Sequence, residues 1–327
     1  MLRKLTPALL ALAFATVGTV RVAHAKTELK FATLAPPQSP WGKVFKKWSK
    51  SVKKKTDGDV EITWLWNGTA GPEGGAVGKI KSGQLQGAAI TAVGLSAIHK
   101  PIIALQMPGA FSTWEELDKA REKLAPDFQT AAQAGGFYIS GWGDVGIGRI
   151  FSKGFDVKVP DDLKGKKPAV IREDIIGPKM YEAIGGVTPV PGSVTEFLPM
   201  LNSGAINVMN TPPLAAEQLQ WASKLDHINT ARTYFGLGAL VVSQKALDKL
   251  GDEKRAIVEE AGKKAAKRLT KRIRKQDDLA LERLKKKMTV HEPTAAEEAE
   301  WKKVFKAGCL RVKSALPGDV LSKIGAC

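Results

Sequence analysis

Residues 29–66 read LKFATLAPPQSPWGKVFKKWSKSVKKKTDGDVEITWLW, and this segment decides the fold class. Residues 29–34 are apolar and β-leaning, and the breaker run at 35–40 ends the strand that they predict. Apolar residues then recur at helical spacing, at Val44, Phe45, Trp48 and Val52. Turn residues at 56–59 precede an alternating strand at 60–66. The segment is therefore a β-α-β unit.

The unit continues downstream. We expect a short helix at 76–81 and a buried strand at 87–91, then a helix at 114–134 capped by Ser112 or Thr113. Alternating strands and helices predict an α/β fold whose sheet is mostly parallel, with helices on both faces.

A second lobe is expected after the strand at 137–140, because residues 141–149 are dense in glycine. Glycine tolerates positive φ and changes of direction, which suits a crossing between lobes. The second lobe has predicted strands at 168–171, 188–190 and 205–209 and predicted helices at 177–184, 194–201 and 215–221. A strand at 238–242 returns toward the first lobe.

Residues 246–287 predict one long helix with an apolar stripe, and Gly262 is the natural place for a bend. An unbroken helix of this length extends about 60 Å and could brace both lobes. Twelve Lys or Arg residues lie between 263 and 287. Acidic interruptions such as Asp277 and the apolar stripe favour a solvated helix face over a surface for nucleic acid or membrane.

The N-terminus resembles a secretory signal peptide. Arg3 and Lys4 precede an apolar run at 5–20, and Ala23-His24-Ala25 fits a cleavage site. We expect cleavage after Ala25 and a periplasmic mature protein, since no later segment is apolar enough to span a membrane.

Charge and cysteine usage fit export. The formal charge of +17 falls to +14 because residues 1–25 hold three basic and no acidic residues. This balance indicates anionic partners, although export argues against nucleic acid. Cys309 and Cys327, 18 positions apart, predict a disulfide at the C-terminus, with two unpaired thiols as the alternative.

Two sequence motifs resemble cofactor-binding sites, but their neighbouring residues do not fit such sites. Residues 141–146 match a dinucleotide fingerprint, but residues 147–151 alternate like a strand where a Rossmann site needs a helix. Residues 74–79 resemble a phosphate loop one residue short, with Ile80 in place of the magnesium-binding hydroxyl. The histidines lack metal-ligand spacing, and there is no Gly-x-Ser-x-Gly elbow. We therefore predict no enzyme, cofactor or metal site.

The chain resembles the solute-binding proteins of TRAP (tripartite ATP-independent periplasmic) transporters over its mature length. The phrases that carry the resemblance are Leu29-Lys30-Phe31-Ala32-Thr33, Gly71-Pro72-Glu73, residues 80–85, residues 161–167 and residues 202–206. The resemblance implies a two-lobed periplasmic binding protein fold (type II-like), with hinge strands and a long C-terminal helix spanning both lobes. We assign residues 26–145 and 236–270 to lobe I, and residues 146–235 and 271–327 to lobe II.

The resemblance also implies an arginine that grips the ligand carboxylate, because a guanidinium matches a planar carboxylate with two hydrogen bonds. At that position this chain has Ala169, and Arg172 lies three residues on. A second family arginine falls on Gly148, with Arg149 adjacent. A strand residue that is an odd number of positions away points to the opposite face, so Arg172 and Arg149 are expected to face away from the ligand.

These departures favour a hydrophobic or weakly polar solute, delivered to integral-membrane permease subunits. Some members of the family work with a tetratricopeptide-repeat partner. A resemblance to these members also implies an apolar cargo. Two alternatives stay open: an organic carboxylate held by Arg149 or Arg172, and a lipid or envelope carrier that docks on anionic membrane. The predicted cleft residues are Trp41, Asn67, Val93, Asp144, Arg149, Asn210, Tyr234 and Phe235, with Arg172 in reserve.

Overall fold

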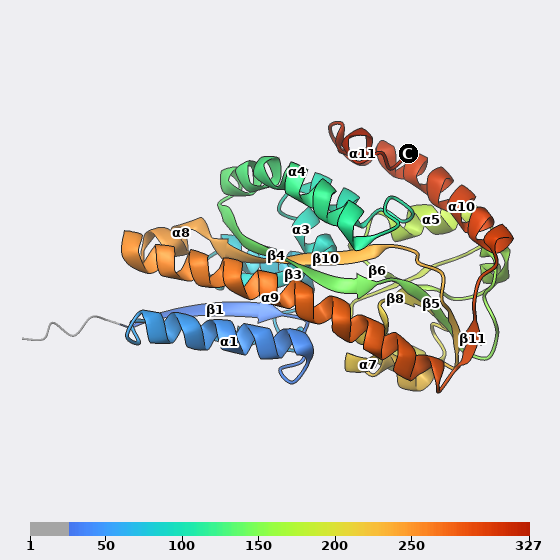
Figure 1. Cartoon of the computed structure of the whole chain (residues 1–327), viewed down its shortest axis with the longest axis horizontal. Coiled ribbons are helices and arrows are strands. Elements are labelled where there is room, and N and C mark those ends of the chain that lie inside the picture. The colour runs from blue at the N-terminus through green and yellow to red at the C-terminus, as the bar shows by residue number, and fades with distance from the viewer. Residues whose placement is uncertain (1–25) are drawn as a thin grey trace, which may run out of the picture.

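The computed structural model describes residues 26–327, and the predicted signal peptide at 1–25 lies outside them. The described chain forms two α/β lobes built on separate sheets (Figure 1). The first sheet has the order β2-β1-β3-β10-β4. Its strands are β1 (Thr27–Thr33), β2 (Val60–Leu65), β3 (Gly87–Thr91), β4 (Phe137–Ile147) and β10 (Phe235–Ser243). Its helical segments are α1 (Pro40–Lys55), α2 (Glu73–Lys81), α3 (Ala92–Ser96), η1 (Lys100–Gln106) and α4 (Trp114–Ala134).

The second lobe has a four-stranded sheet of order β11-β9-β5-β8 and a two-stranded sheet of β6 and β7. The strands are β5 (Arg149–Ser152), β6 (Ala169–Ile171), β7 (Val190–Gly192), β8 (Val208–Thr211), β9 (His227–Asn229) and β11 (Thr289–His291). The helical segments are η2 (Pro160–Leu163), α5 (Gly177–Ile184), α6 (Phe197–Ser203), α7 (Pro213–Gln218) and η3 (Trp221–Lys224). The C-terminal helices are α8 (Gln244–Asp248), α9 (Asp252–Lys285), α10 (Ala295–Lys313) and α11 (Val320–Lys323).

The expectation of a mostly parallel sheet is wrong. β1 pairs in parallel with β2 and β3, but β10 is antiparallel to both of its neighbours, and β5 is antiparallel to β8 and β9. The reason lies in the crossing between lobes. β4 leaves the first lobe and β10 returns to it, so the two strands must run in opposite directions where they pair, from Phe235 opposite Ile147 to Ser243 opposite Phe137.

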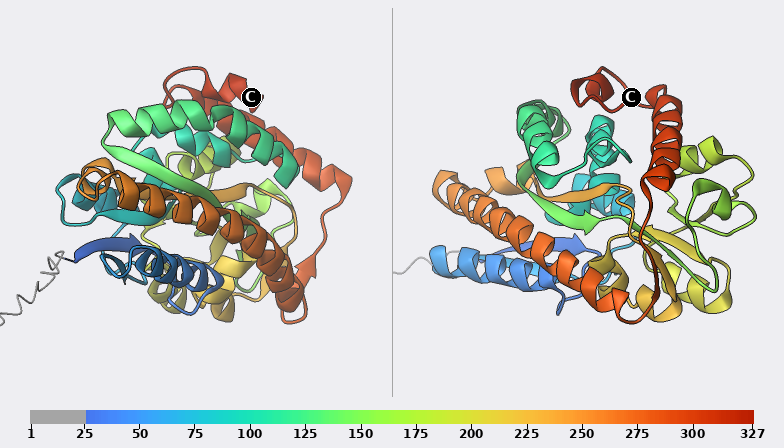
Figure 2. Two further views of the ribbon diagram at one scale, coloured as in Figure 1. Left: turned by 60° about the vertical axis from the view of Figure 1, so that its left-hand side comes forward. Right: turned by 45° about the vertical axis from the view of Figure 1, so that its right-hand side comes forward.

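The long C-terminal helix is interrupted once. Residues 246–287 were expected as one helix with a bend near Gly262, whereas the chain breaks at Gly251, where φ is +73°, and α9 then runs through Gly262. With 34 residues, α9 is about 50 Å long. It contacts α1 and β4 in the first lobe and α7 in the second, so it braces both lobes (Figures 1 and 2).

Glycines in β4 let α9 approach closely. A Cβ on Gly141 would lie 2.4 Å from the Cβ of Ala266, and a Cβ on Gly143 would lie 2.5 Å from Cδ2 of Leu269. Neither glycine has a positive φ. Gly141 and Gly143 therefore serve helix packing rather than a change of chain direction.

Gly146 is the one glycine of β4 with positive φ, at +136°. A Cβ there would lie 2.6 Å from the Asp277 carboxylate of α9. Asp277 accepts hydrogen bonds from the backbone of Ile147 (2.8 Å) and of Leu214 in α7 (2.9 Å). Burial raises the pKa of Asp277 to about 6. Asp277 thus joins the helix to both the crossing strand and the second lobe.

Asp144 ties the edge strand β4 to helices on both faces of the sheet. Its buried carboxylate binds Nη1 of Arg121 in α4 at 2.8 Å and Nε of Arg274 in α9 at 2.6 Å. Asp118 bonds to both of these arginines as well. The two cations and two anions therefore satisfy one another within one cluster.

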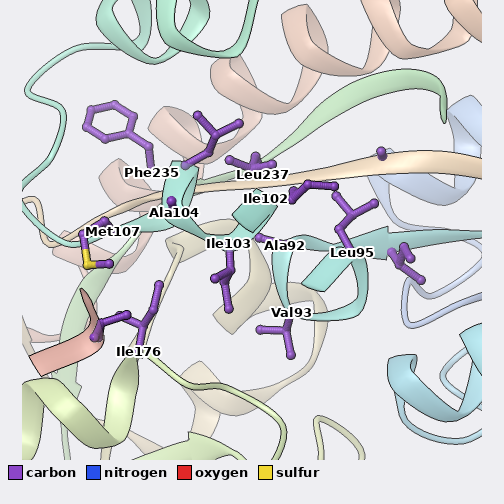
Figure 3. Close-up of a cluster of buried hydrophobic side chains, with 14 of the residues drawn as sticks. Ala92, Val93, Leu95, Ile102, Ile103, Ala104, Met107, Ile176, Phe235 and Leu237 are labelled. Carbon is purple, nitrogen blue, oxygen red and sulfur yellow. The ribbon is translucent and has the colours of Figure 1, made fainter. Parts of the chain in front are cut away.

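Apolar packing joins the lobes around α3 and η1. Figure 3 shows Val93, Ile103 and Phe235 in this core together with Ile176 of the second lobe. The C-terminal segment closes over the same cluster, and the predicted disulfide between Cys309 and Cys327 is confirmed. Within residues 26–327, no helix combines the length and apolarity needed to cross a bilayer.

We expect Gly141→Ala to lower the free energy of unfolding by about 1–3 kcal/mol, because the added methyl overpacks the contact with Ala266. Urea denaturation of single and double variants measures this. Adding Ala266→Gly should recover part of the loss, so that the double variant is less destabilised than the sum of the single variants. Gly75→Ala, which meets open space in α2, should be neutral or stabilising. Additive losses would contradict the packing argument.

Candidate ligand-binding cleft

A cleft of about 170 Å³ lies between the lobes, beside the crossing strands. Its first-lobe lining includes Thr33, Leu34, Trp41, Phe45, Glu73, Thr91 and Val93. Its second-lobe lining includes Ile171, Val194, Thr211, Trp221 and Tyr234. The cleft therefore lies beyond the ends of β1 and β3, where α/β sheets present their ligand sites.

Trp41 is fixed by the start of α1. Ser39 caps the start of α1, two positions before Trp41. Its side chain accepts a hydrogen bond from the Gly42 backbone. The indole Nε1 of Trp41 donates to the backbone oxygen of Asp144 at 3.2 Å. Phe45, one turn later, stacks on Trp64 with ring centroids 4.8 Å apart. These contacts hold both aromatic side chains in place along one wall.

Glu73 is a buried carboxyl group in this wall, with 7% of its surface exposed. Its oxygens accept hydrogen bonds from the Thr91 backbone (2.8 Å), the Thr91 hydroxyl (2.5 Å) and the Gly94 backbone (3.2 Å). The pKa of Glu73 is raised to about 7, because the effect of burial is larger than the opposite effect of these hydrogen bonds. The predicted site omits Glu73, and the phrase Gly71-Pro72-Glu73 is the signal that could have found it.

A second cavity, of about 150 Å³, adjoins the cleft and is called the deep chamber below. The two cavities share the lining residues Val93, Gln106, Ile171, Thr211, Trp221 and Tyr234. Ala169 and Asp174 line the deep chamber. Asp174 accepts hydrogen bonds from the backbone of Ile176 and Gly177, and burial raises its pKa.

The ring of Tyr234 occupies the space beside Gly148. A Cβ on Gly148 would lie 2.3 Å from the Tyr234 ring, so any larger residue at position 148 would displace that ring. The hydroxyl of Tyr234 reaches the backbone oxygen of Asn210 at 3.5 Å, and burial raises the pKa of Tyr234. The ring thus forms part of the wall shared by both cavities.

The structure brings together five of the nine residues predicted for the site. Trp41, Val93, Asp144 and Tyr234 line the cleft, and Asn210 lines the deep chamber. The carboxylate of Asp144 is already bound by the two arginines described above. The side-chain oxygen of Asn210 accepts a hydrogen bond from the Thr233 hydroxyl at 2.7 Å.

Two of the remaining predicted residues lie elsewhere. Asn67 is exposed in the loop after β2 with a positive φ of 57°. Phe235 lies in the apolar core, edge-to-face with Trp114 at 4.8 Å. Neither residue lines the cleft or the deep chamber.

Neither of the predicted arginines lines the cleft or the deep chamber. Arg172 lies at the cleft mouth, more than half exposed, and pairs with Glu196 at 3.0 Å. Arg149 is buried, and its Nε and Nη1 have no hydrogen-bond partner among the described residues. Burial, together with nearby Arg232, lowers the pKa of Arg149 to about 10.

The ionisable side chains of the two cavities are acidic. Across the described part of the chain, neither cavity has a lysine or arginine in its lining. Glu73 and Asp174 each rely on uncharged donors, and no ion pair to either is found over residues 26–327. Among the same residues, no group of three or more His, Cys, Asp or Glu side chains could hold a metal ion.

Comparison with known proteins matches residues 31–313 to the family of bacterial extracellular solute-binding proteins, family 7 (DctP). The C4-dicarboxylate-binding periplasmic protein DctP of Rhodobacter capsulatus is 22% identical over 285 residues, covering 85% of this chain and 84% of that protein. A solute-binding protein of Chromohalobacter salexigens is 23% identical over 233 residues, covering 71% of this chain and 69% of that protein.

Solved structures share the fold. A TRAP periplasmic solute-binding protein from Sulfurospirillum deleyianum, with bound succinate, superposes with a TM-score of 0.86 at 18% identity, covering 92% of this chain and 99% of that one. A second, from Chromohalobacter salexigens with bound D-glucuronate, gives 0.83 at 18% identity, covering 91% and 98%. With its two lobes, its interlobe cleft and a family match over most of its length, the chain belongs to bacterial extracellular solute-binding protein family 7, a family of substrate-binding transport proteins rather than enzymes.

Proposed function

We propose that this protein captures a hydrophobic or weakly polar solute in the cleft and delivers it to the membrane permease of a TRAP-type transporter. The observation that carries the proposal is the lining of the two cavities, which is mostly apolar and includes no lysine or arginine among the described residues. A carboxylate bound there would give up its hydration without a countercharge, at a cost of several kcal/mol. An apolar solute gains free energy from the same transfer.

The two positions where the family resemblance predicts arginines support the same cargo. Ala169 leaves room in the deep chamber, which a longer side chain would fill. At Gly148 the space beside the backbone is taken by the Tyr234 ring. An aromatic ring at one position and free volume at the other suit an apolar ligand that extends from the cleft into the deep chamber.

Solved relatives with the same fold carry other ligands, succinate in one and D-glucuronate in another. The alternative that this chain binds an organic carboxylate depends on Arg149 or Arg172. Arg149 is buried outside both cavities, and Arg172 would have to leave Glu196 and turn inward from the mouth. We therefore favour an apolar cargo over an organic carboxylate.

Contacts across the mouth explain how the cargo would be held. A Cβ on Gly68 would lie 2.9 Å from Thr195, and the Gly74 backbone faces the Glu173 carboxylate at 3.5 Å. The lobes therefore touch outside the cleft. A ligand that contacts both lobes only in this closed form stabilises it by the difference between its affinities for the closed and open forms.

A carrier that docks on anionic membrane is a second candidate function, favoured by one surface. Helices α1 and α9 lie side by side (Figure 1). Both expose lysine or arginine along their length. The exposed basic residues include Lys43, Lys47, Lys50, Lys264, Arg268 and Arg272. This surface is called the basic face below. A tetratricopeptide-repeat partner stays a prediction from the family resemblance.

Mass spectrometry of small molecules released by denaturing the purified protein should recover a largely apolar solute without a carboxylate group, in an amount near that of the protein. Such a solute fits cavities without a cationic anchor. Buffer from a mock purification controls for carry-over. Recovery of a small carboxylate at that ratio would count against the proposed cargo.

Ala169→Arg should change the ligand that the cleft prefers from an apolar solute to a carboxylate. The guanidinium would fill the deep chamber and supply two hydrogen bonds to a carboxylate, so thermal shift should detect short carboxylates such as succinate and lose the extracted solute. Ala169→Leu fills the same space without charge and should lose the extracted solute without gaining a carboxylate. If wild type already responds to carboxylates, and Arg172→Ala abolishes the response, the carboxylate alternative is correct.

The membrane candidate predicts co-sedimentation with vesicles containing phosphatidylglycerol at low salt, lost at about 0.5 M salt because screening weakens charge attraction. Replacing Lys47, Lys50, Arg268 and Arg272 by glutamate should abolish sedimentation. The matched control replaces Lys302, Lys303, Lys306 and Lys313 of α10, which are also exposed, and should keep it. Equal binding to neutral phosphatidylcholine vesicles would reject this candidate.

A further inference from the structure

The acidic groups of the cleft are not explained by an apolar cargo alone. Glu73 and Asp174 lie in the walls of two adjacent cavities whose described lining has no lysine or arginine. The buried Asp144, which also lines the cleft, is matched by Arg121 and Arg274, whereas Glu73 and Asp174 have no ion pair among the described residues. A carboxyl group inside an apolar cavity is costly unless a bound partner compensates it.

Glu73 is fixed in position and still able to bind. Three donors from Thr91 and Gly94 hold its two oxygens, and a carboxylate can accept about four hydrogen bonds. The group stands in the first turn of α2, where the helix dipole also favours negative charge. Lone-pair capacity therefore remains for one further donor, and Glu73 lines the cleft from which that donor would come.

Aromatic side chains surround the same cavity. Trp41, Phe45, Trp221 and Tyr234 all line the cleft, and the first three are buried. Aromatic faces attract cations, most strongly when the cation is removed from water. A cleft with aromatic walls, an uncompensated carboxyl and no basic lining residue is suited to an organic cation.

We propose that the cargo carries a positively charged amine or ammonium group, which lies against the Glu73 carboxylate while its apolar part contacts the aromatic walls and extends toward the deep chamber. This inference rests on the proposed apolar cargo and adds the charge of its polar group. The same arrangement disfavours carboxylates, because they would face Glu73 and Asp174 without a countercharge.

Binding of such a cation should be coupled to proton release. The elements packed on Glu73, namely α3, β3 and β10, have no charged or titratable residue, and the negative charge of Glu173 across the mouth also raises the pKa of Glu73. Burial gives Glu73 a pKa of about 7, and a bound cation favours the ionised form. Affinity for a cation should therefore rise roughly tenfold between pH 6 and pH 8, as the proton on Glu73 is lost.

The test compares ligands that share a skeleton and differ in charge. The probes are 2-phenylethylamine, 2-phenylethanol and phenylacetate, and the corresponding hexyl and cyclohexylmethyl series. Calorimetry on the full-length mature protein should give the lowest Kd for the ammonium member of at least one series, by tenfold or more over the alcohol, with the carboxylate weakest. This preference should grow with pH between 6 and 8.

Variants assign the effect to Glu73. Glu73→Gln should remove the ammonium advantage and its pH dependence while changing the Kd of the alcohol by less than about threefold. Glu115→Gln, exposed in α4 outside both cavities, should change the ammonium Kd by less than about threefold. The Kd of the alcohol also reports on folding of each variant.

The outcomes separate this inference from the proposed function. Alcohols that bind as tightly as ammonium ions, or no ammonium response in any series, would overturn the cationic cargo and leave an apolar neutral cargo in place. A carboxylate that binds best would overturn both. An ammonium advantage that survives in Glu73→Gln would overturn the role of Glu73.

Discussion

The close approach of α9 to the edge strand β4 is the constraint on which the two-lobed structure depends. The approach is possible because Gly141 and Gly143 offer no side chain to Ala266 and Leu269. It is held at the edge by the Asp144 cluster and at the crossing by Asp277, which binds backbone from both lobes. Movement between the lobes must therefore occur around a helix that is already fixed to the first lobe.

This constraint also determines where the interior charges lie. Arg121 and Arg274 are used to join α4 and α9 to Asp144, and they are outside the cleft. A protein with a formal charge of +17 along its full sequence thus has a ligand cavity without a lysine or arginine in its described lining. Glu73 is held by hydrogen bonds from uncharged donors, and no ion pair to it is found among residues 26–327.

The sequence predicts local structure well and spatial relations less well. The helices at 114–134 and 177–184 and the strand at 87–91 follow from apolar spacing and turn residues, and the structure has them at those residues. The direction of β10 could not be predicted, because antiparallel pairing depends on a chain that returns from the other lobe. The glycine density of residues 141–149 predicts a crossing between lobes, but the role of Gly141 depends on Ala266, more than a hundred positions away. Glu73 stands in the phrase Gly71-Pro72-Glu73, which carries the family resemblance, but its burial depends on β3 and α3 and cannot be inferred from that phrase.

Positions 148 and 149 explain why a shared fold does not fix the cargo. Neighbouring residues of an extended strand face opposite sides, so an arginine at 148 and one at 149 would serve different environments. Here Gly148 admits the Tyr234 ring to the cavity wall, while Arg149 is buried outside both cavities among Arg232 and the acidic groups of α9. The cation is thus present in the sequence but absent from the described lining of the cleft. At the position where the family resemblance places an arginine, this chain therefore has an aromatic ring in the cavity wall.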